Sequence, residues 1–333
     1  MMVPELKKAI KRGVVKARLL SAAAIFQSPR LIILRYHSVL DDPLEHADSI
    51  GSGIIHSSTE FAQQMQYLAC TCNPVTMDQV LDFARGSRGL PPRSVAVTFD
   101  DGFADNLSVA IPILNRYGVP AAIYVMAGYV SSIPWYCTLR YIFARTQRTS
   151  FTDPFNGTTR SLNPENRYES YLACSRACAA TPRARIDAAM MALEKALEVE
   201  YRPMEPIMLS WNGVREVIHQ GHTVGSHSLS HPNLAYISPE ELRDQMADSQ
   251  KILESQTASR IRHFSYPSPI MEPHWTEATV ETCRATGYET AVTCGIGSVR
   301  CGDMPLSLKR TFAHGTLDEY TWALENMFAG RIV

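Results

Sequence analysis

The chain lacks the charge bias that marks nucleic-acid-binding proteins. Its 333 residues include 32 Lys and Arg against 33 Asp and Glu, so the formal net charge is -1 at pH 7. Bulk charge therefore gives no reason to expect a nucleic-acid partner. The sequence also lacks any run of about 20 apolar residues, so we expect no membrane-spanning helix.

Cysteine spacing does not indicate a disulfide framework or a zinc module. The eight cysteines include Cys70-x-Cys72 and Cys174-x-x-x-Cys178, which miss the two-residue spacing usual for zinc ligands. We expect reduced, mostly buried thiols, which favours a cytoplasmic location. With 45% hydrophobic and 20% charged residues, the composition is that of a globular protein with a substantial core.

The first 30 residues differ from the rest of the chain. Read as a helix, residues 5–26 place Leu6, Ile10 and Val14 on one face and most of the basic side chains on the other. This pattern is typical of a helix at an anionic membrane surface, which favours peripheral contact with the inner membrane. A terminal helix that packs its apolar face on the domain explains the pattern equally well. A secretory signal is disfavoured because the apolar run is short and no small-residue cleavage site follows.

Short apolar runs alternate with helical patterns along most of the chain, which predicts parallel βα units. The expected strands cover residues 31–36, 94–99, 121–126, 222–226, 261–266, 288–293 and 305–312. The expected helices cover residues 59–71, 106–117, 210–220, 238–255, 274–286 and 316–329. Several of these strands end directly at histidine or aspartate. A barrel with its site at the strand C-termini therefore fits better than an open sheet.

The alternation fails between about 130 and 205. This segment contains Trp135, a polar stretch from Asp153 to Asn166, and an alanine-rich helical run at 184–198. It is too long for a simple loop, so we interpret it as a helical insertion. The remainder of residues 31–333 would then form one domain.

Two pairs of reactive side chains stand out. Asp100 and Asp101 end the apolar run 94–99, and His227 and His231 follow a glycine-bounded strand. The segment from His227 to His231 therefore opens a loop or a short helical turn. In one turn of helix, residues four apart face the same way, which would let both imidazoles reach one ion. One carboxylate and two imidazoles can hold a divalent cation, and the second carboxylate would be a base beside it.

The motifs Thr98-Phe-Asp-Asp-Gly102, His227-Ser-Leu-Ser-His231 and His263-Phe-Ser-Tyr-Pro267 occur in that order along the chain. Their order and spacing resemble the polysaccharide deacetylase family, the NodB-homology carbohydrate esterases. The opening Leu34-Arg-Tyr-His-Ser-Val39 is similar to a subgroup of that family with a Tyr-His-x-Val strand. The resemblance covers roughly residues 31–315.

This resemblance implies an α/β fold, a distorted (β/α) barrel. It also implies a metal-dependent hydrolase that removes an N-acyl group, acetyl first of all, from an amino sugar. The substrate would be a bacterial polysaccharide or its lipid-linked precursor. Asp101, His227 and His231 would hold one divalent metal ion. Zinc is the first choice, and cobalt, nickel, manganese and iron are alternatives. Asp100 would be the general base.

The resemblance leaves the general acid as a choice between two histidines. His37 matches the histidine that serves in the subgroup, and we favour it, while His314 is the rival. Arg310 resembles an arginine that closes the barrel, and it would orient the base. Tyr266 and Pro267 of the third motif would contact the substrate.

Departures from the family pattern leave the substrate open. Ser265 replaces the arginine that usually orients the base, and Ser268-Pro269 replace an aromatic-glycine pair. Within the hydrolase class, a deformylase of a lipid-linked formamido sugar and a deacylase of small non-sugar amides are alternatives. A non-catalytic glycan-binding barrel is the alternative from a different class. It is disfavoured because all three expected ligands and the adjacent base are present.

Overall fold

The computed structural model describes residue 13, residues 30–313 and residues 315–332. Within that part of the chain, seven parallel strands close into a barrel in the order β1-β12-β11-β10-β9-β6-β5, with β5 pairing back to β1. The strands are β1 (Ile32–Tyr36), β5 (Ser94–Phe99), β6 (Ala121–Val125), β9 (Thr223–Ser226), β10 (His263–Ser265), β11 (Thr290–Ile296) and β12 (Leu308–Phe312). The predicted (β/α) barrel is confirmed, and each expected strand overlaps an observed one.

Two predictions fall on residues that the structure does not describe. The amphipathic segment over residues 5–26 and the rival acid His314 both lie outside the described residues. Among the helices that are described, none combines the length and the apolar character needed to cross a membrane.

Side chains of the barrel strands alternate between the interior and the outer face, as the two-residue period of a strand requires. In β1, Ile32 and Leu34 belong to the outer cluster that packs on the helices, whereas Ile33 belongs to the inner cluster. Neighbouring strands add Ala96, Ala122, Tyr124, Val292 and Leu308 to that inner cluster. The lower barrel is therefore filled with apolar side chains, and only its upper part is open to polar groups.

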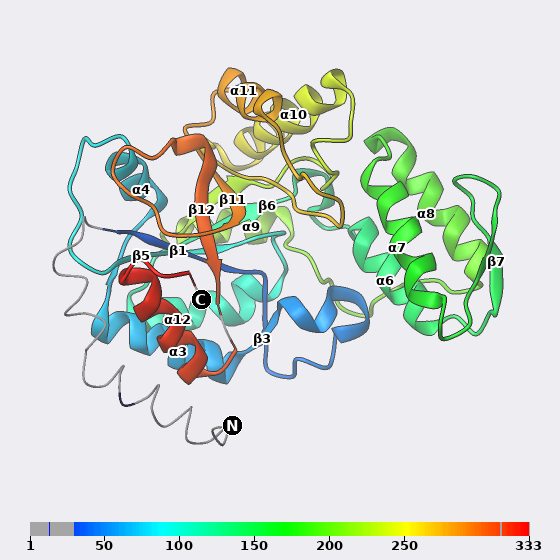
Figure 1. Ribbon diagram of the computed structural model, residues 1–333, viewed down its shortest axis with the longest axis horizontal. Coiled ribbons are helices and arrows are strands. Elements are labelled where there is room, and N and C mark those ends of the chain that lie inside the picture. The colour runs from blue at the N-terminus through cyan, green and yellow to red at the C-terminus, as the bar shows by residue number, and fades with distance from the viewer. Residues whose placement is uncertain (1–12, 14–29, 314, 333) are drawn as a thin grey trace.

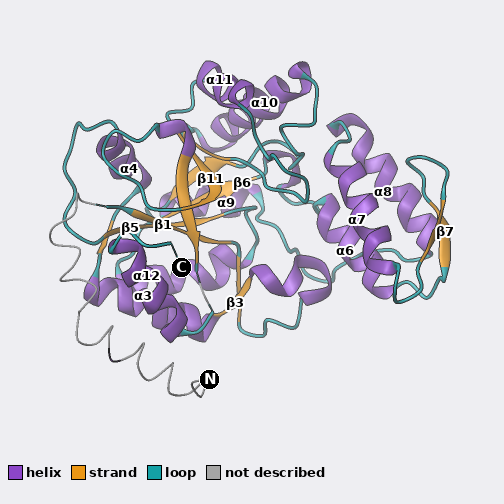
Figure 2. Cartoon of the chain, viewed as in Figure 1, coloured by secondary structure: helices purple, strands orange, loops and turns teal. Residues whose placement is uncertain are grey.

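Helices cover the outside of the barrel, as Figures 1 and 2 show. They are α3 (Ser58–Thr71), α5 (Ile111–Tyr117), α9 (Trp211–His219), α10 (Pro239–Thr257), α11 (Glu277–Thr286) and α12 (Leu317–Phe328). The further helix α4 (Met77–Ala84) packs its apolar side chains on the inner cluster instead. Side chains of Ser57, Ser210, Ser238 and Thr316 accept a backbone N–H of the first turn and so fix where four of these helices begin.

Several short elements join these parts. They are β2 (Ser38–Leu40), β3 (Ile55–Ser57), β4 (Asn73–Pro74), the π turns η1 (Ala47–Gly51) and η3 (Asn106–Ala110), and the 3-10 turns η2 (Ser52–Ile54), η4 (Ala127–Tyr129) and η5 (Pro305–Ser307). β2 pairs with β3 in a small parallel sheet, and β4 pairs with β5 outside the barrel closure. The expected strand over 305–312 therefore begins as a 3-10 turn.

A helical unit projects from one side of the barrel (Figure 1, right). It contains α6 (Trp135–Arg145), α7 (Arg167–Ala179), α8 (Arg183–Leu197) and the antiparallel pair β7 (Ser150–Thr152) and β8 (Thr159–Ser161). Most residues of its apolar cluster, among them Leu139, Ile142, Leu193 and Leu197, come from this unit. The unit therefore has a core distinct from those of the barrel.

All eight cysteines are free thiols, as the sequence predicted. Five are buried, namely Cys72, Cys137, Cys174, Cys178 and Cys283. Cys294 at the end of β11 is partly exposed.

Candidate active site

Strand register brings the predicted site residues to one end of the barrel. β1 and β5 pair Tyr36 with Phe99, so the next residues, His37 and Asp100, leave adjacent strands at the same level. The Asp100 amide continues this pairing by donating to the Tyr36 carbonyl at 3.0 Å. On the other side of the barrel, His227 follows β9 directly. The C-terminal end of the barrel is therefore the site, as in other α/β barrels.

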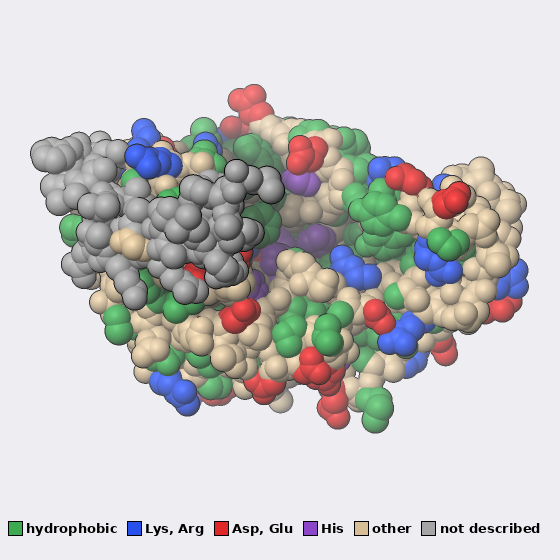
Figure 3. Space-filling model, turned by 60° about the horizontal axis from the view of Figure 1, so that its bottom comes forward, with side chains coloured by type: hydrophobic (Ala, Val, Ile, Leu, Met, Phe, Trp, Pro, Cys, Tyr) green, Lys and Arg blue, Asp and Glu red, His purple; other side chains and the backbone are tan. Residues whose placement is uncertain are grey.

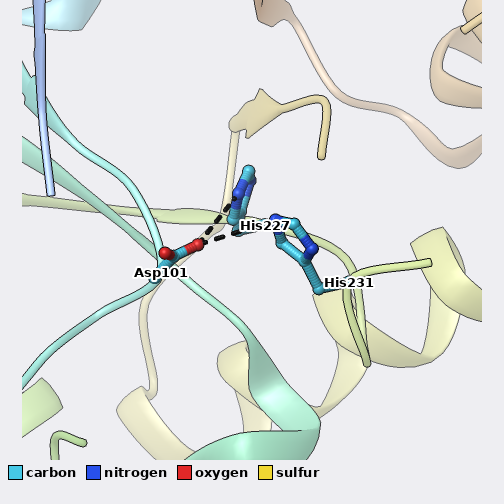
Figure 4. Close-up of side chains that lie close together, drawn as sticks. All are labelled: Asp101, His227 and His231. Atoms are coloured by element: carbon cyan, nitrogen blue, oxygen red, sulfur yellow. Dashed lines mark ion pairs between the residues drawn. The ribbon is translucent and has the colours of Figure 1, made fainter. Parts of the chain in front are cut away.

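Asp101, His227 and His231 converge, as Figure 4 shows. The Asp101 Oδ1 atom lies 3.3 Å from His227 Nε2 and 3.7 Å from His231 Nε2. Candidate ligand atoms of all three residues lie within 4.8 Å of one another. The side chains predicted to share one ion are therefore brought together.

Hydrogen bonding around His227 assigns its protons. Its Nδ1 atom lies 2.8 Å from the Ser265 carbonyl oxygen, which can only accept, so Nδ1 carries a proton. In the neutral ring, Nε2 then presents a lone pair to the Asp101 carboxylate. Asp101 Oδ1 is buried and lacks a hydrogen-bond partner. Two electron-rich atoms face each other here, which is favourable only when a proton or a metal cation lies between them.

Charges in this cluster shift the pKa values in opposite directions. Burial alone would raise the pKa of Asp101, but the neighbouring His227 and His231 imidazoles lower it to about 2. Burial alone would lower the pKa of His227, but the Asp100 and Asp101 carboxylates outweigh burial and raise it. Burial lowers the pKa of His231 to about 4. Asp101 is therefore ionised and His231 is neutral at pH 7, which are the protonation states of metal ligands.

Of the loop and the short helical turn that the sequence left open for His227 and His231, the structure shows the loop. Residues 227–233 form a loop with no helical turn. Ser228 and His231 have positive φ, at 65° and 57°, and Asp101 has φ 75°. L-residues adopt this left-handed region rarely and at a cost, and such strain gathers at functional sites. A strained loop, rather than helical periodicity, aims the two imidazoles at Asp101.

Helix α10 holds this loop in place. The Gln245 side-chain oxygen accepts hydrogen bonds from the amides of Leu229 and Ser230, at 3.1 and 2.9 Å. The Ser249 hydroxyl donates to the Ser228 carbonyl at 3.0 Å. From the opposite side, the Gly128 amide donates to the Leu229 carbonyl at 2.8 Å, and a Cβ at that glycine would lie only 2.5 Å from this oxygen. The loop geometry is therefore set by packed neighbours on both sides.

Asp100 forms a buried network with Arg310 and Ser265. The Arg310 Nη1 and Nη2 atoms donate to Asp100 Oδ1 and Oδ2 at 2.8 and 2.7 Å. The Ser265 hydroxyl donates to Asp100 Oδ1 at 3.0 Å and accepts from Arg310 Nη2 at the same distance. Arg310 therefore lies where a base-orienting group was predicted, and Ser265 bridges it to the carboxylate.

The network keeps Asp100 ionised. Burial alone would raise the pKa of Asp100, but the charge of Arg310 and its hydrogen bonds, together with His227, hold it far below the usual range. The Arg310 Nε atom also donates to the Thr293 carbonyl at 3.0 Å. A carboxylate fixed by two parallel hydrogen bonds is well oriented, although its basicity is reduced.

A cavity of about 330 Å³ opens onto His37, Asp101 and His231. Other barrel residues in its wall are Arg35, Ser268, Pro269, Ile270 and Phe312, and the helical unit adds Trp135, Tyr136, Arg140, Tyr171 and Ser175. Figure 3 shows histidine side chains in a hollow of this face, with basic side chains close by. A larger cavity of about 450 Å³, lined by residues such as Arg300 and Lys309, contains none of the predicted site residues.

His37 lies in the wall of the site cavity. Burial lowers the pKa of His37 to about 4, against the opposing effect of the Asp101 and Asp100 charges. It is therefore a neutral imidazole at pH 7. Its rival His314 lies outside the described residues, so the choice between them stays a prediction.

Tyr266 and Pro267 do not line the cavity. Tyr266 is fully buried in the outer core, where its hydroxyl donates to the Leu306 carbonyl at 2.9 Å. Pro267 is also buried, and Ser268 and Pro269 line the cavity in their place. This placement does not support the prediction that the Tyr266 side chain contacts the substrate.

Sequence reasoning missed the residues that the helical unit contributes. The Tyr136 ring lies 5.1 Å from the His231 ring, and burial with the nearby Asp101 carboxylate raises the pKa of Tyr136 well above its usual value. No motif or spacing marks Tyr136 or Arg140. Arg35 could have been found, because it precedes His37 by two residues and so shares its side of β1.

Comparisons with known proteins agree with this geometry. A family model described as Polysaccharide deacetylase matches residues 87–291, more than half of the chain. The chain is 20% identical over 270 residues to the protein YxkH of Bacillus subtilis (strain 168), which is named for the same family, and the match covers 81% of this chain and 66% of that protein. A shorter match, 40% identical over 42 residues, is to the peptidoglycan-N-acetylglucosamine deacetylase of Bacillus cereus and covers 13% of this chain and 15% of that protein. The chain thus spans less than two thirds of the length of either protein.

Solved structures share the fold. IcaB from Ammonifex degensii superposes with a TM-score of 0.59 at 21% identity, over 92% of this chain and 99% of that chain. The Streptococcus pyogenes deacetylase PplD, solved in complex with acetate, superposes with a TM-score of 0.57 at 19% identity, over 86% and 93%. Because the family model spans most of the barrel, from before β5 into β11, the chain belongs to the polysaccharide deacetylase family.

Proposed function

We propose that the protein is a metal-dependent hydrolase that removes an N-acyl group, acetyl first of all, from an amino sugar. The observation that carries this proposal is the convergence of Asp101, His227 and His231 beside the Asp100–Arg310 pair, with Asp101 and His231 in the wall of the cavity. Family membership supports the reaction class. Hydrolysis of an acyl amide needs both an activated water and a base, which the Asp101 cluster and Asp100 would supply.

The residues fit a divalent metal ion. Asp101 Oδ1 has no hydrogen-bond partner, and the proton on His227 Nδ1 leaves Nε2 free to coordinate. One carboxylate and two imidazoles form the ligand set of many catalytic zinc sites, although cobalt, nickel, manganese and iron accept the same donors. A cation held there supplies Lewis-acid activation of water and of the acyl carbonyl.

Asp100 is proposed as the general base. It accepts the proton of the attacking water while a new C–O bond forms at the acyl carbon. Arg310 and Ser265 fix the direction of its oxygens, so the carboxylate loses little orientational entropy during the step. Because the depressed pKa of Asp100 makes it a weak base, the proton transfer depends on prior activation of the water.

His37 is proposed as the general acid. The leaving nitrogen needs a proton when the C–N bond breaks, and His37 lines the same cavity as Asp101. Since burial keeps His37 neutral at pH 7, it must first take up a proton. The proton that Asp100 removes from the water would supply it, so that both residues return to their starting states when the amine leaves.

The helical unit is proposed to be an insertion over about residues 130–205 that shapes the substrate site. Trp135, Tyr136 and Tyr171 bring aromatic side chains to the cavity wall. Aromatic surface suits the apolar faces of a sugar ring. The substrate class we favour is a bacterial polysaccharide or its lipid-linked precursor.

Residues 5–26 are proposed to give peripheral contact with the cytoplasmic face of the inner membrane, because their basic amphipathic pattern suits an anionic surface. Deleting residues 1–27 is expected to reduce binding to anionic vesicles without reducing hydrolysis of a soluble substrate. Unchanged vesicle binding would remove this part of the proposal.

The experiment that tests the function is mass spectrometry of acylated amino sugars incubated with the zinc-loaded protein. Loss of an acetyl group supports the proposal, and loss of formyl alone identifies a deformylase. If neither group is released, while the sugars still bind, the protein is a glycan-binding barrel and the proposal is wrong.

A further inference from the structure

The cavity beside the Asp101 cluster has an excess of positive charge. Among the described residues that line it, the side chains charged at neutral pH are Arg35, Arg140 and Asp101. Two positive charges and one negative charge give the cavity wall a formal charge of +1 when no cation is counted at Asp101. Asp100 does not offset this excess positive charge, because both of its oxygens are bound by Arg310.

Arg35 is a buried arginine without a carboxylate partner. Its side chain lies inside the upper barrel, 5% exposed, and its guanidinium stacks on the Phe312 ring at 3.8 Å. Its Nε atom is buried and has no hydrogen-bond partner, and it forms no ion pair with any described carboxylate. A buried guanidinium is costly unless acceptors satisfy its donors. Arg35 is therefore held flat against an aromatic ring, with the Cys294 thiol as its side-chain hydrogen-bond partner and Nε unbonded.

Arg140 reaches the cavity from α6. Its Nη1 donates to the carbonyls of Ser49 and Ile50, and it packs so closely on Gly51 that a Cβ there would lie 2.6 Å from Nη1. Arg140 forms no ion pair with a described carboxylate. Arg145 on the same helix, by contrast, pairs with Asp48 at 2.6 Å. Backbone carbonyls therefore fix one edge of the Arg140 guanidinium, and no described carboxylate neutralises its charge at the cavity wall.

We propose that Arg35 and Arg140 bind an oxyanion on the substrate, so that the protein acts on an N-acyl amino sugar that carries a phosphate or carboxylate group. The proposal rests on the proposed deacylase function, because Asp101 and His231 line the same cavity. Guanidinium groups present parallel N–H donors that match the oxygens of phosphate and carboxylate. An anion there would neutralise the excess positive charge of the cavity wall.

Cys294 is the rival partner for Arg35. Burial would raise the pKa of Cys294, but His274, Ser268 and the two arginines Arg35 and Arg310 lower it to about 7. A thiolate there offsets part of the charge of Arg35 but leaves its Nε unbonded. Replacing Cys294 by Ser separates the two possibilities.

The test is calorimetric binding of four probes to the zinc-loaded full chain. The probes are inorganic phosphate, N-acetylglucosamine, its 1-phosphate, and the uronic acid of the same sugar. We expect at least one charged sugar to bind about 10- to 100-fold more tightly than the neutral one, as charged hydrogen bonds predict. Arg35→Gln and Arg140→Gln should each remove most of this preference. Arg145→Gln is the matched control on α6 and should keep it.

Each outcome decides a separate point. A preference for the phosphate or for the uronic acid identifies the source of the oxyanion. Equal binding of charged and neutral sugars, or a preference that survives in both Arg35→Gln and Arg140→Gln, overturns the proposal. A preference that is lost in Cys294→Ser but kept in Arg35→Gln assigns the recognition to the thiol. Should Arg35→Gln fail to fold, Arg140→Gln still decides, because Arg140 lies outside the barrel interior.

Failure of the proposed function is distinguishable from failure of this inference. Binding that depends on Arg35 and Arg140 without release of any acyl group leaves the inference standing and removes the hydrolase. Release of acetyl from neutral and charged sugars with the same KM, unchanged in Arg140→Gln, leaves the hydrolase and removes the inference.

Discussion

The Arg310 guanidinium binds both carboxylate oxygens of Asp100, with N–O distances of 2.8 and 2.7 Å, at a place where neither side chain is more than 3% exposed. A bidentate pair out of contact with water fixes both partners in one orientation. It also makes each partner dependent on the other, because either charge alone would be buried without compensation. The prediction for Arg310 follows from this dependence.

Replacing Asp100 by Asn should lower kcat by about 10²- to 10⁴-fold, the usual contribution of a general base. Zinc content should stay at the wild-type level, because Asp101, His227 and His231 are unchanged. Metal analysis of the purified variant and its rate of acetyl release check both statements. Substantial remaining activity in Asp100→Asn would contradict the role of base.

Replacing Arg310 by Met should destabilise the protein by about 3–5 kcal/mol, because the Asp100 carboxylate is left buried and unpaired. The double variant with Asp100→Asn should recover part of that loss, since the uncompensated charge is gone. Urea unfolding of the single and double variants measures the coupling. Arg243→Gln, which breaks an exposed pair with Glu240, is the control and should cost less than about 1 kcal/mol. Purely additive effects would show that the two side chains do not depend on each other.

Removing the metal should lower the thermal midpoint, and adding zinc should restore it, because a ligand that binds only the folded state stabilises it. Asp101→Asn should lose this response. Asparagine tolerates the positive φ of this position, so the variant removes the charge without adding backbone strain. Differential scanning calorimetry with and without chelator measures the shift. A zinc response in Asp101→Asn equal to that of the wild type would exclude Asp101 as a ligand.

Replacing His37 by Ala should reduce kcat by about 10²- to 10⁴-fold if His37 protonates the leaving amine. His314→Ala should leave kcat near the wild-type value. Steady-state rates on the same acyl sugar compare the two. The opposite ranking would transfer the acid role to His314.

Acidification should destabilise the protein partly through His37. The pKa of His37 is about 4 in the folded protein and about 6.5 in an unfolded chain. Between these two pH values, His37 binds a proton in the unfolded state but not in the folded state. Stability is therefore lost as the pH falls from 6.5 towards 4. We expect His37 to account for about 1–2 kcal/mol between pH 7.5 and 5. Urea unfolding at both values should show a smaller loss in His37→Asn than in the wild type. An equal loss of stability in His37→Asn and in the wild type would show that other groups cause the acid sensitivity.

Much of the fold could be predicted from the sequence because burial of parallel strands leaves a local signal. All seven barrel strands read as short apolar runs, and residues such as Gly118 mark where helices end. The short strands β2, β3, β7 and β8 were missed, since three-residue strands carry too few side chains for a period to be recognised. β10 is equally short, but it lies within the longer predicted run 261–266. The sequence left open whether His227 and His231 lie in a loop or a helical turn, because the positive φ at Ser228 and His231 depends on packing against α10.

By itself, the sequence determined which strands build the barrel and which side chains stand at their ends. The two-residue period of a strand and the motif spacing are local properties, so the sequence alone was enough to single out Asp100, Asp101, His227 and His231. Only the tertiary structure decided what surrounds them. The bidentate ion pair between Arg310 and Asp100 joins residues that are 210 positions apart. The cavity wall joins Arg35 of β1 to Tyr136 and Arg140 of α6, and no local rule encodes that contact.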